Sequence, residues 1–118
     1  MAGVARISAT DLSLLLQSRE EVILLDVRQP DERAFASIPV PADKGDLFIP
    51  LGELTARLDE VKSRCGSNTQ VVVYCHHGVR SLRAANWLAA QGLANLTNLD
   101  GGIDAWSESV DPAIPQYC

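Results

Sequence analysis

Short apolar runs alternate along the chain with segments in which hydrophobic residues recur every three or four positions. The runs are Val22–Val27, Leu47–Ile49 and Val71–Tyr74, and Leu96–Leu99 is expected as a further short strand. Runs this short, rich in branched residues, are typical of strands buried on both faces of a parallel sheet. The alternation therefore predicts an α/β fold, in which a central, mostly parallel sheet is covered by helices on both faces.

The segments between these runs carry helix start and stop signals. Several begin with a capping residue or a proline, and acids follow in the first turn. The segment Leu51–Lys62 places leucines and a valine on a single helix face, which predicts one continuous helix. In chain order, helices are expected after a Ser8–Asp11 capping box and over Pro30–Phe35, Leu51–Lys62, Leu82–Ala90 (before a terminating glycine at 92) and Ile103–Trp106.

Composition narrows the class of protein. The chain has 118 residues, of which 47% are hydrophobic and 21% charged, and this predicts one globular domain over residues 1–118. The formal net charge of −5 argues against nucleic acid or an anionic membrane as a partner. An anionic substrate would need a local positive pocket to overcome this field.

Targeting signals and cysteine spacing indicate a cellular compartment. The first residues lack the apolar stretch of a signal peptide, and no run reaches the length of a membrane span. Cys65, Cys75 and Cys118 form an odd set whose spacing fits neither a disulfide framework nor a zinc ribbon. We therefore expect a cytoplasmic protein, with Cys65 and Cys118 as passive thiols.

Cys75 opens the most informative segment, Cys75-His-His-Gly-Val-Arg-Ser81. The segment connects a predicted strand to a predicted helix, at the strand end where parallel sheets bind ligands. Backbone N–H groups of such a loop converge, and the helix N-terminus adds partial positive charge. A thiol at this point should ionise readily and act as a nucleophile.

Three neighbours of Cys75 have both a functional and a structural interpretation. We expect Arg80 to bind an anionic substrate rather than to pair with an acid. Gly78 is expected to adopt a backbone conformation that larger residues resist. For Ser81, a hydrogen bond to the sulfur and a role as helix cap are equally consistent with the sequence.

The two histidines complete the loop. They lack the usual spacing of zinc ligands, and no second ligand cluster accompanies them, so no metal site is predicted. We expect them at the mouth of the pocket, partly solvated, where either would add positive charge below neutral pH. With Cys75 as the catalytic residue, the expected substrate-binding residues are His76, His77, Gly78, Val79, Arg80 and Ser81.

Four segments together resemble the rhodanese-like sulfurtransferase family, single-domain type. Each is weak alone, but they occur in the family's order over nearly the whole chain. They are Leu24–Glu32, Ile49–Leu51, Val73–Ser81 and Asn98–Trp106. Where the family often has Gly-His-Ile-Pro-Gly-Ala, this chain has Ala36-Ser-Ile-Pro-Val-Pro and additional residues, which changes the rim of the expected pocket.

The resemblance implies a two-step transfer of sulfane sulfur. Cys75 would take the outer sulfur of a small anionic donor such as thiosulfate, become a persulfide, and pass the sulfur to cyanide or a thiol. No cofactor is implied, and a sulfur-relay protein is a further possible acceptor. Asp26 and Arg28, at the end of the first of these segments' strands, could tune the pocket electrostatically, but we expect a structural ion pair and strand-end cap instead. Trp106 is expected to pack in the core rather than to contact substrate.

Two other functions are compatible with such a loop. Rhodanese-like domains also act as regulatory binding modules or as persulfide relays without small-molecule turnover. Phosphatases and arsenate reductases of related fold also surround an anion with a cysteine and an arginine. Their loop is one residue longer, however, and this chain has serine at position 81, where that spacing would need arginine.

Overall fold

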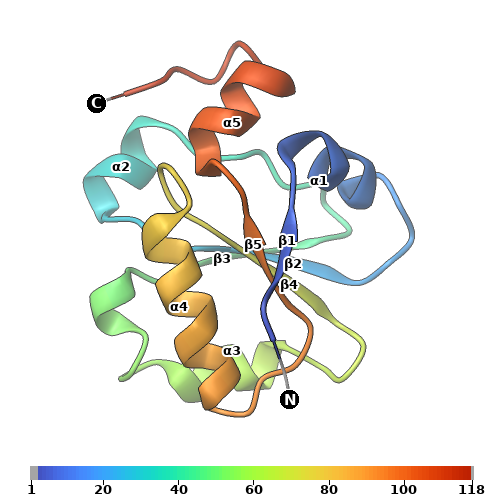
Figure 1. Cartoon of the computed structure of the whole chain (residues 1–118), viewed down its shortest axis with the longest axis vertical. Helices are drawn as coiled ribbons and strands as arrows, with labels where there is room; N and C mark the ends of the chain where they lie inside the picture. Colours follow the sequence, from blue (N-terminus) through green and yellow to red (C-terminus); the bar gives the residue numbers. More distant parts are fainter. Residues whose placement is uncertain (1–2, 118) are drawn as a thin grey trace.

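Five parallel strands form one sheet at the centre of the molecule (Figure 1). The structure is a computed structural model that describes residues 3–117. The strands are β1 (Ala5–Ile7), β2 (Val22–Asp26), β3 (Gly45–Phe48), β4 (Gln70–Tyr74) and β5 (Leu96–Leu99), in the spatial order β1-β5-β4-β2-β3. The predicted α/β class and the parallel sheet are confirmed, and β4, which leads to Cys75, lies in the middle.

Helices cover both faces of the sheet, as the sequence predicts. They are α1 (Ala9–Leu16), α2 (Pro30–Phe35), the 3₁₀ helix η1 (Leu51–Glu53), α3 (Leu58–Arg64), α4 (Val79–Ala90) and α5 (Gly102–Ser109). Figure 1 shows α3 and α4 on one side of the sheet and α1 and α5 on the other. Each side encloses its own apolar core.

The continuous apolar run of β4 follows from this two-sided burial. Val71 and Val73 pack in the core beneath α3 and α4, whereas Val72 and Tyr74 pack in the core beneath α1 and α5. Successive side chains of a strand point to opposite faces, so a strand covered on both faces needs an apolar residue at every position. Trp106 lies in the second core, as expected.

The structure differs from the predicted elements in two places. No strand is foreseen at Ala5–Ile7, yet this segment pairs with β5 at the edge of the sheet. The single helix expected over Leu51–Lys62 is instead two pieces, η1 and α3. Arg57 has φ −110° and ψ 17°, outside the helical region, and so breaks the axis between them.

Candidate active site

Cys75 lies directly beyond the end of β4, at the carboxyl edge of the sheet. The residue exposes 1% of its surface, and the backbone N–H of Gly78 donates a hydrogen bond of 3.1 Å to its sulfur. The loop turns at Gly78, which has φ +99° and precedes the first residue of α4. The conformation expected of this glycine is confirmed, and a Cβ there would lie 3.2 Å from Gly101 N and Leu99 O.

Asn98, at the end of β5, fixes the loop through its side-chain amide. Its Nδ2 donates to the carbonyl oxygen of Gly78 at 3.2 Å, and its Oδ1 accepts from the Ser81 hydroxyl at 2.5 Å. All of these groups are buried. Of the two roles that the sequence left open for Ser81, neither is seen, because its hydroxyl donates to Asn98.

The first turn of α5 supports the loop from behind. The N–H of Ile103 donates to the carbonyl oxygen of Cys75 at 2.9 Å, and the N–H of Asp104 donates to that of His76 at 3.3 Å. Free N–H groups at a helix N-terminus are natural partners for such carbonyls. The loop is thus held by β5 and α5 as well as by its own chain neighbours.

Arg80 forms a two-point ion pair with Glu32 of α2. Its Nη1 donates to Oε1 at 2.6 Å and its Nη2 donates to Oε2 at 2.7 Å. The hydrogen bonds from Arg80 lower the pKa of Glu32 to about 2, and the same pair raises the pKa of Arg80 above its ordinary value. The sequence favoured an anionic substrate as the partner of Arg80, whereas the structure gives it a carboxylate from the chain.

Glu32 is held by two further groups. The backbone N–H of Gln29 donates to Oε1 at 3.1 Å, which completes a capping box at the start of α2. The hydroxyl of Tyr117 donates to Oε2 at 2.7 Å, and burial raises the pKa of this phenol to about 12, so it keeps its proton at neutral pH. The position of this carboxylate is therefore closely determined.

His76 and His77 both face the carboxylate of Asp104. The Nε2 atoms lie 3.1 Å and 2.9 Å from its two oxygens, and the imidazole rings stack with centroids 3.8 Å apart. His76 is buried rather than partly solvated as expected, because Tyr117 covers its other face at 3.9 Å. Contrary to the spacing argument, the ligand atoms of the two histidines and Asp104 lie within 4.8 Å of one another, an arrangement that could hold a metal ion.

Asp26 and Arg28 form a fully buried pair, in agreement with the structural role expected of them. Arg28 donates through Nε and Nη2 to the two oxygens of Asp26, at 2.9 Å and 2.7 Å. Its remaining donors reach the carbonyl of Ala36 at 2.7 Å and the hydroxyl of Tyr117 at 3.0 Å. The pair thereby links the end of β2 to the segment after α2 and to the C-terminal tail.

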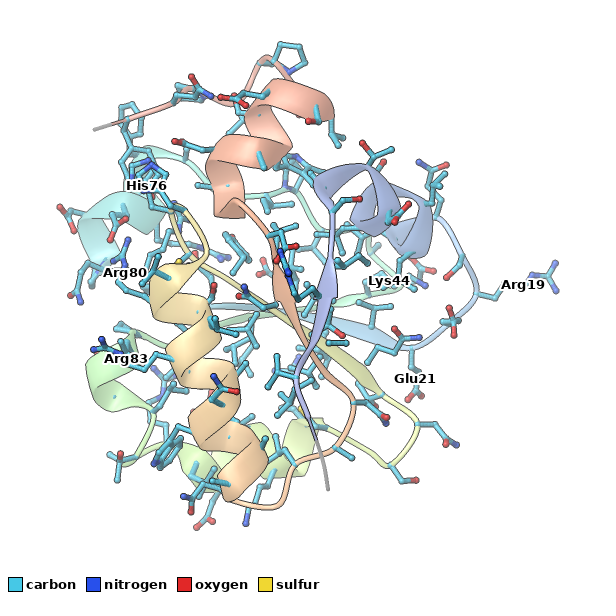
Figure 2. All side chains as sticks on the ribbon, viewed as in Figure 1. Arg19, Glu21, Lys44, His76, Arg80 and Arg83 are labelled. Atoms are coloured by element: carbon cyan, nitrogen blue, oxygen red, sulfur yellow. The ribbon has the colours of Figure 1, made fainter. Side chains whose placement is uncertain are left out.

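A surface cavity adjoins the loop. It is lined by Gln29, Asp31, Glu32, Phe35, His76, Arg80 and Tyr117, and Cys75 is not among these residues. Figure 2 shows His76 and Arg80 at the α2 side of the molecule, with Arg83 further along α4. Arg83 lines a separate depression with Leu51, Leu54, Thr55 and Trp87. Val79 is 70% exposed at the start of α4.

Of the other two cysteines, the structure describes only Cys65, which lies away from this site. Cys65 ends α3, before β4 begins, and therefore lies at the opposite end of β4 from Cys75. Its thiol is half-buried, and this burial raises its pKa. Cys118 lies outside the described residues.

The chain belongs to the family of rhodanese-like domains. The family model matches residues 8–109, which contain every strand except β1 and every helix. The resemblance inferred from the four sequence segments is thus confirmed.

Relatives cover this chain to different extents. It is 34% identical over 111 residues to a protein of Allochromatium vinosum named sulfurtransferase, covering 94% of this chain and 95% of the relative. It is 38% identical over 98 residues to the Arabidopsis thaliana rhodanese-like/PpiC domain-containing protein 12, covering 83% of this chain but 31% of that protein. A rhodanese-like domain protein from Staphylococcus aureus has the same fold, with a TM-score of 0.75 and 25% identity over 98% of this chain and 100% of its own.

Within residues 3–117, we find no helix whose length and apolar character would suffice to cross a bilayer.

Proposed function

We propose that this protein is a sulfurtransferase that carries one sulfane sulfur atom on Cys75. The observation that most supports the proposal is the Gly78 N–H directed at the Cys75 sulfur, at the N-terminus of α4. A hydrogen-bond donor and a helix N-terminus both favour the anionic forms of sulfur, thiolate before transfer and persulfide after it. The name of the full-length A. vinosum relative agrees with this activity.

The transfer proceeds in two nucleophilic displacements. In the first, the Cys75 thiolate attacks the outer sulfur of a donor. With thiosulfate, a new S–S bond forms, the original S–S bond breaks, and sulfite leaves with the bonding electron pair. In the second, cyanide or a thiolate attacks the outer sulfur of the Cys75 persulfide, and the Cys75 thiolate is the leaving group. Splitting the transfer in this way is the general advantage of covalent catalysis.

The loop is held in place by β5 and α5, and such a rigid loop suits a residue that carries a sulfur atom. Ile103 and Asn98 hold the backbone of the loop from behind. The Gly78 N–H, which is already directed at the sulfur, needs no reorganisation when the charge moves from one sulfur to the next. The persulfide would therefore be stabilised by groups that also stabilise the thiolate.

Intact-mass spectrometry tests the proposal directly. The protein is mixed with a sulfane-sulfur donor, the excess donor is removed, and the intact mass of the protein is measured. The proposal predicts a gain of one sulfur atom that is lost on adding cyanide and does not occur in Cys75→Ser. Cys65→Ser is the matched control, because it removes a thiol at the other end of β4, and it should load like the wild type.

Comparing sulfur donors distinguishes a small-molecule sulfurtransferase from a protein that relays persulfide sulfur. Loading from thiosulfate supports a small-molecule sulfurtransferase. Loading only from a protein persulfide, such as that of a cysteine desulfurase, supports a relay. If no donor loads Cys75, or if Cys75→Ser loads as well as the wild type, the proposal is wrong and the binding-module alternative stands in its place.

A further inference from the structure

The basic side chains of the loop face carboxylates of the same chain. Arg80 pairs with Glu32, and His76 and His77 both contact Asp104. In a chain with a net charge of −5, an anionic substrate needs a local positive pocket. Within the described residues, each basic side chain of the loop instead faces a carboxylate, which bears on the donors that can reach the sulfur.

The geometry of the Arg80–Glu32 pair is the same as that of an oxyanion bound to arginine. Both terminal nitrogens of Arg80 donate in parallel to two oxygens, at 2.6 Å and 2.7 Å. The sulfonate end of thiosulfate would use this same pair of donors. Glu32 and a sulfonate group therefore compete directly for the two terminal nitrogens of Arg80, which we call the anion-binding fork of Arg80.

Glu32 is a strong competitor because it is held independently of Arg80. The Gln29 N–H and the Tyr117 hydroxyl each donate to one of its oxygens, and its side chain is only 14% exposed. With its pKa lowered to about 2, the carboxylate stays charged at any physiological pH. A dianionic donor must both displace this group and approach its negative charge.

The pair also lies where it would influence the reaction. Arg80 and Glu32 line the cavity that adjoins the loop. The Cys75 sulfur is close enough for its charge to contribute to the raised pKa of Arg80. A donor in this cavity contacts the pair directly, whereas Cys75 does not line the cavity.

We infer that Glu32 is a specificity-determining residue, which occupies the anion-binding fork of Arg80 and thereby favours sulfur donors without a charged oxygen group over thiosulfate. This inference rests on the proposed sulfur transfer to Cys75. The favoured class comprises persulfides, in which the Cys75 thiolate attacks the terminal sulfur of R–S–SH. The R–S thiolate leaves, and the persulfide proton remains with the transferred sulfur or passes to solvent.

The test compares two donors on one preparation of each variant. Loading rates of Cys75 are measured by quenched-flow mass spectrometry with thiosulfate and with benzyl hydropersulfide released from a precursor. Because the readout is a ratio of rates, any fraction of unfolded protein cancels. Glu32→Gln keeps an oxygen for the Gln29 N–H but removes the charge, and we expect it to raise the thiosulfate-to-hydropersulfide ratio about tenfold or more.

Two further variants show whether the effect is specific. Asp31→Asn removes a charge from the neighbouring, exposed residue of α2, which lines the same cavity, and should change the ratio less than about twofold. If Glu32 acts through Arg80, the gain from Glu32→Gln should disappear when Arg80→Ala is added, which is the non-additivity expected of contacting residues.

The outcomes distinguish this inference from the proposed function. If the wild type loads from neither donor, the sulfurtransferase proposal is wrong, and so is the assignment of Glu32, which depends on it. If the wild type loads but Glu32→Gln leaves the ratio unchanged, or Asp31→Asn raises it equally, only the assignment of Glu32 is overturned. A gain that persists without Arg80 overturns it as well, because the fork would then have no part in selection.

Discussion

Gly102 shows how closely α5 approaches the active-site loop. A Cβ at this position would overlap the carbonyl groups of both Cys75 and His76. The backbone has φ +60°, a region that residues with a side chain seldom adopt. The hydrogen bond from Ile103 to the Cys75 carbonyl depends on this approach. A residue outside the loop therefore determines the loop's shape.

Gly102→Ala should destabilise the protein and slow sulfur loading together. We expect the free energy of unfolding to fall by about 2–4 kcal/mol, because backbone strain and overlap act at one place. Urea denaturation and the loading rate on Cys75 measure the two effects. Gly52→Ala is the control, since nothing lies within 4 Å of the added methyl group, and it should change stability by less than about 0.5 kcal/mol. An unchanged loading rate in Gly102→Ala would contradict the role given to α5.

At the scale of elements, β5 contributes to the site although none of its residues was predicted there. Asn98 lies 20 positions after Gly78 and 17 after Ser81, and its amide satisfies a buried group on each. Removing one partner of a buried hydrogen bond leaves the other without a partner, at a cost of about 1–3 kcal/mol. The end of β5 therefore stabilises the start of α4.

Asn98→Ala should lower the free energy of unfolding by about 1–3 kcal/mol, because it leaves the buried Ser81 hydroxyl unpaired and removes one of the two donors to the Gly78 carbonyl. It should also slow sulfur loading, as the loop loses one of its supports. Thr97→Val is the control in the same strand, because it preserves branching at a position that makes no hydrogen bond to the loop. If Asn98→Ala were as stable as Thr97→Val, the amide would not be the support that its contacts indicate.

The clearest strand signals in the sequence come from the strands buried on both faces. The runs at β2 and β4 are apolar at nearly every position because each face packs against a core. Ala5–Ile7 at the sheet edge has only three residues, two of them exposed, and so carries no such signal. The sequence does not reveal the break at Arg57, because Leu54 and Val61 are both buried although Leu54 follows η1 and Val61 lies in α3.

The site was predictable only as far as local spacing reaches. Cys75, Gly78 and the start of α4 lie within a few residues of one another, and a strand-loop-helix pattern fixes their relation. Glu32 is 48 residues from Arg80, so no spacing rule connects them. Its acidic character was instead explained by its place in the first turn of α2. The ion pair appears only when the parallel strands bring α2 and α4 to one edge.

At the scale of the whole molecule, the ion pair links the site to acid stability. In the unfolded chain, the Glu32 carboxyl binds a proton near its ordinary pKa of 4.5, whereas in the folded protein this pKa is about 2. Between these values the unfolded state binds more protons, so stability falls as the pH falls. The contribution of Glu32 is fully present above about pH 4.5 and is lost as the pH approaches 2.

Glu32→Gln should therefore flatten the acid side of the stability profile. Relative to the wild type, we expect the variant to lose about 1–2 kcal/mol less between pH 4.5 and 2, after allowance for solvent screening of a surface cavity. Urea denaturation at several pH values measures the difference. Asp31→Asn, which removes a carboxyl next to the pair, controls for the general effect of charge. Parallel profiles for wild type and Glu32→Gln would contradict the structural pairing itself.

The support of the loop by α5 also has a consequence for protein synthesis. Cys75 is translated before Asn98, Gly102 and Ile103, which hold the loop in the folded protein. Until these residues have also left the ribosome and docked, the thiol belongs to a stretch of nascent chain without fixed structure and is open to oxidants. Only when the last helix docks does the cysteine withdraw to its 1% exposure. The reactive group is thus enclosed as one of the final events of folding, and slow docking of α5 prolongs its exposure to oxidants.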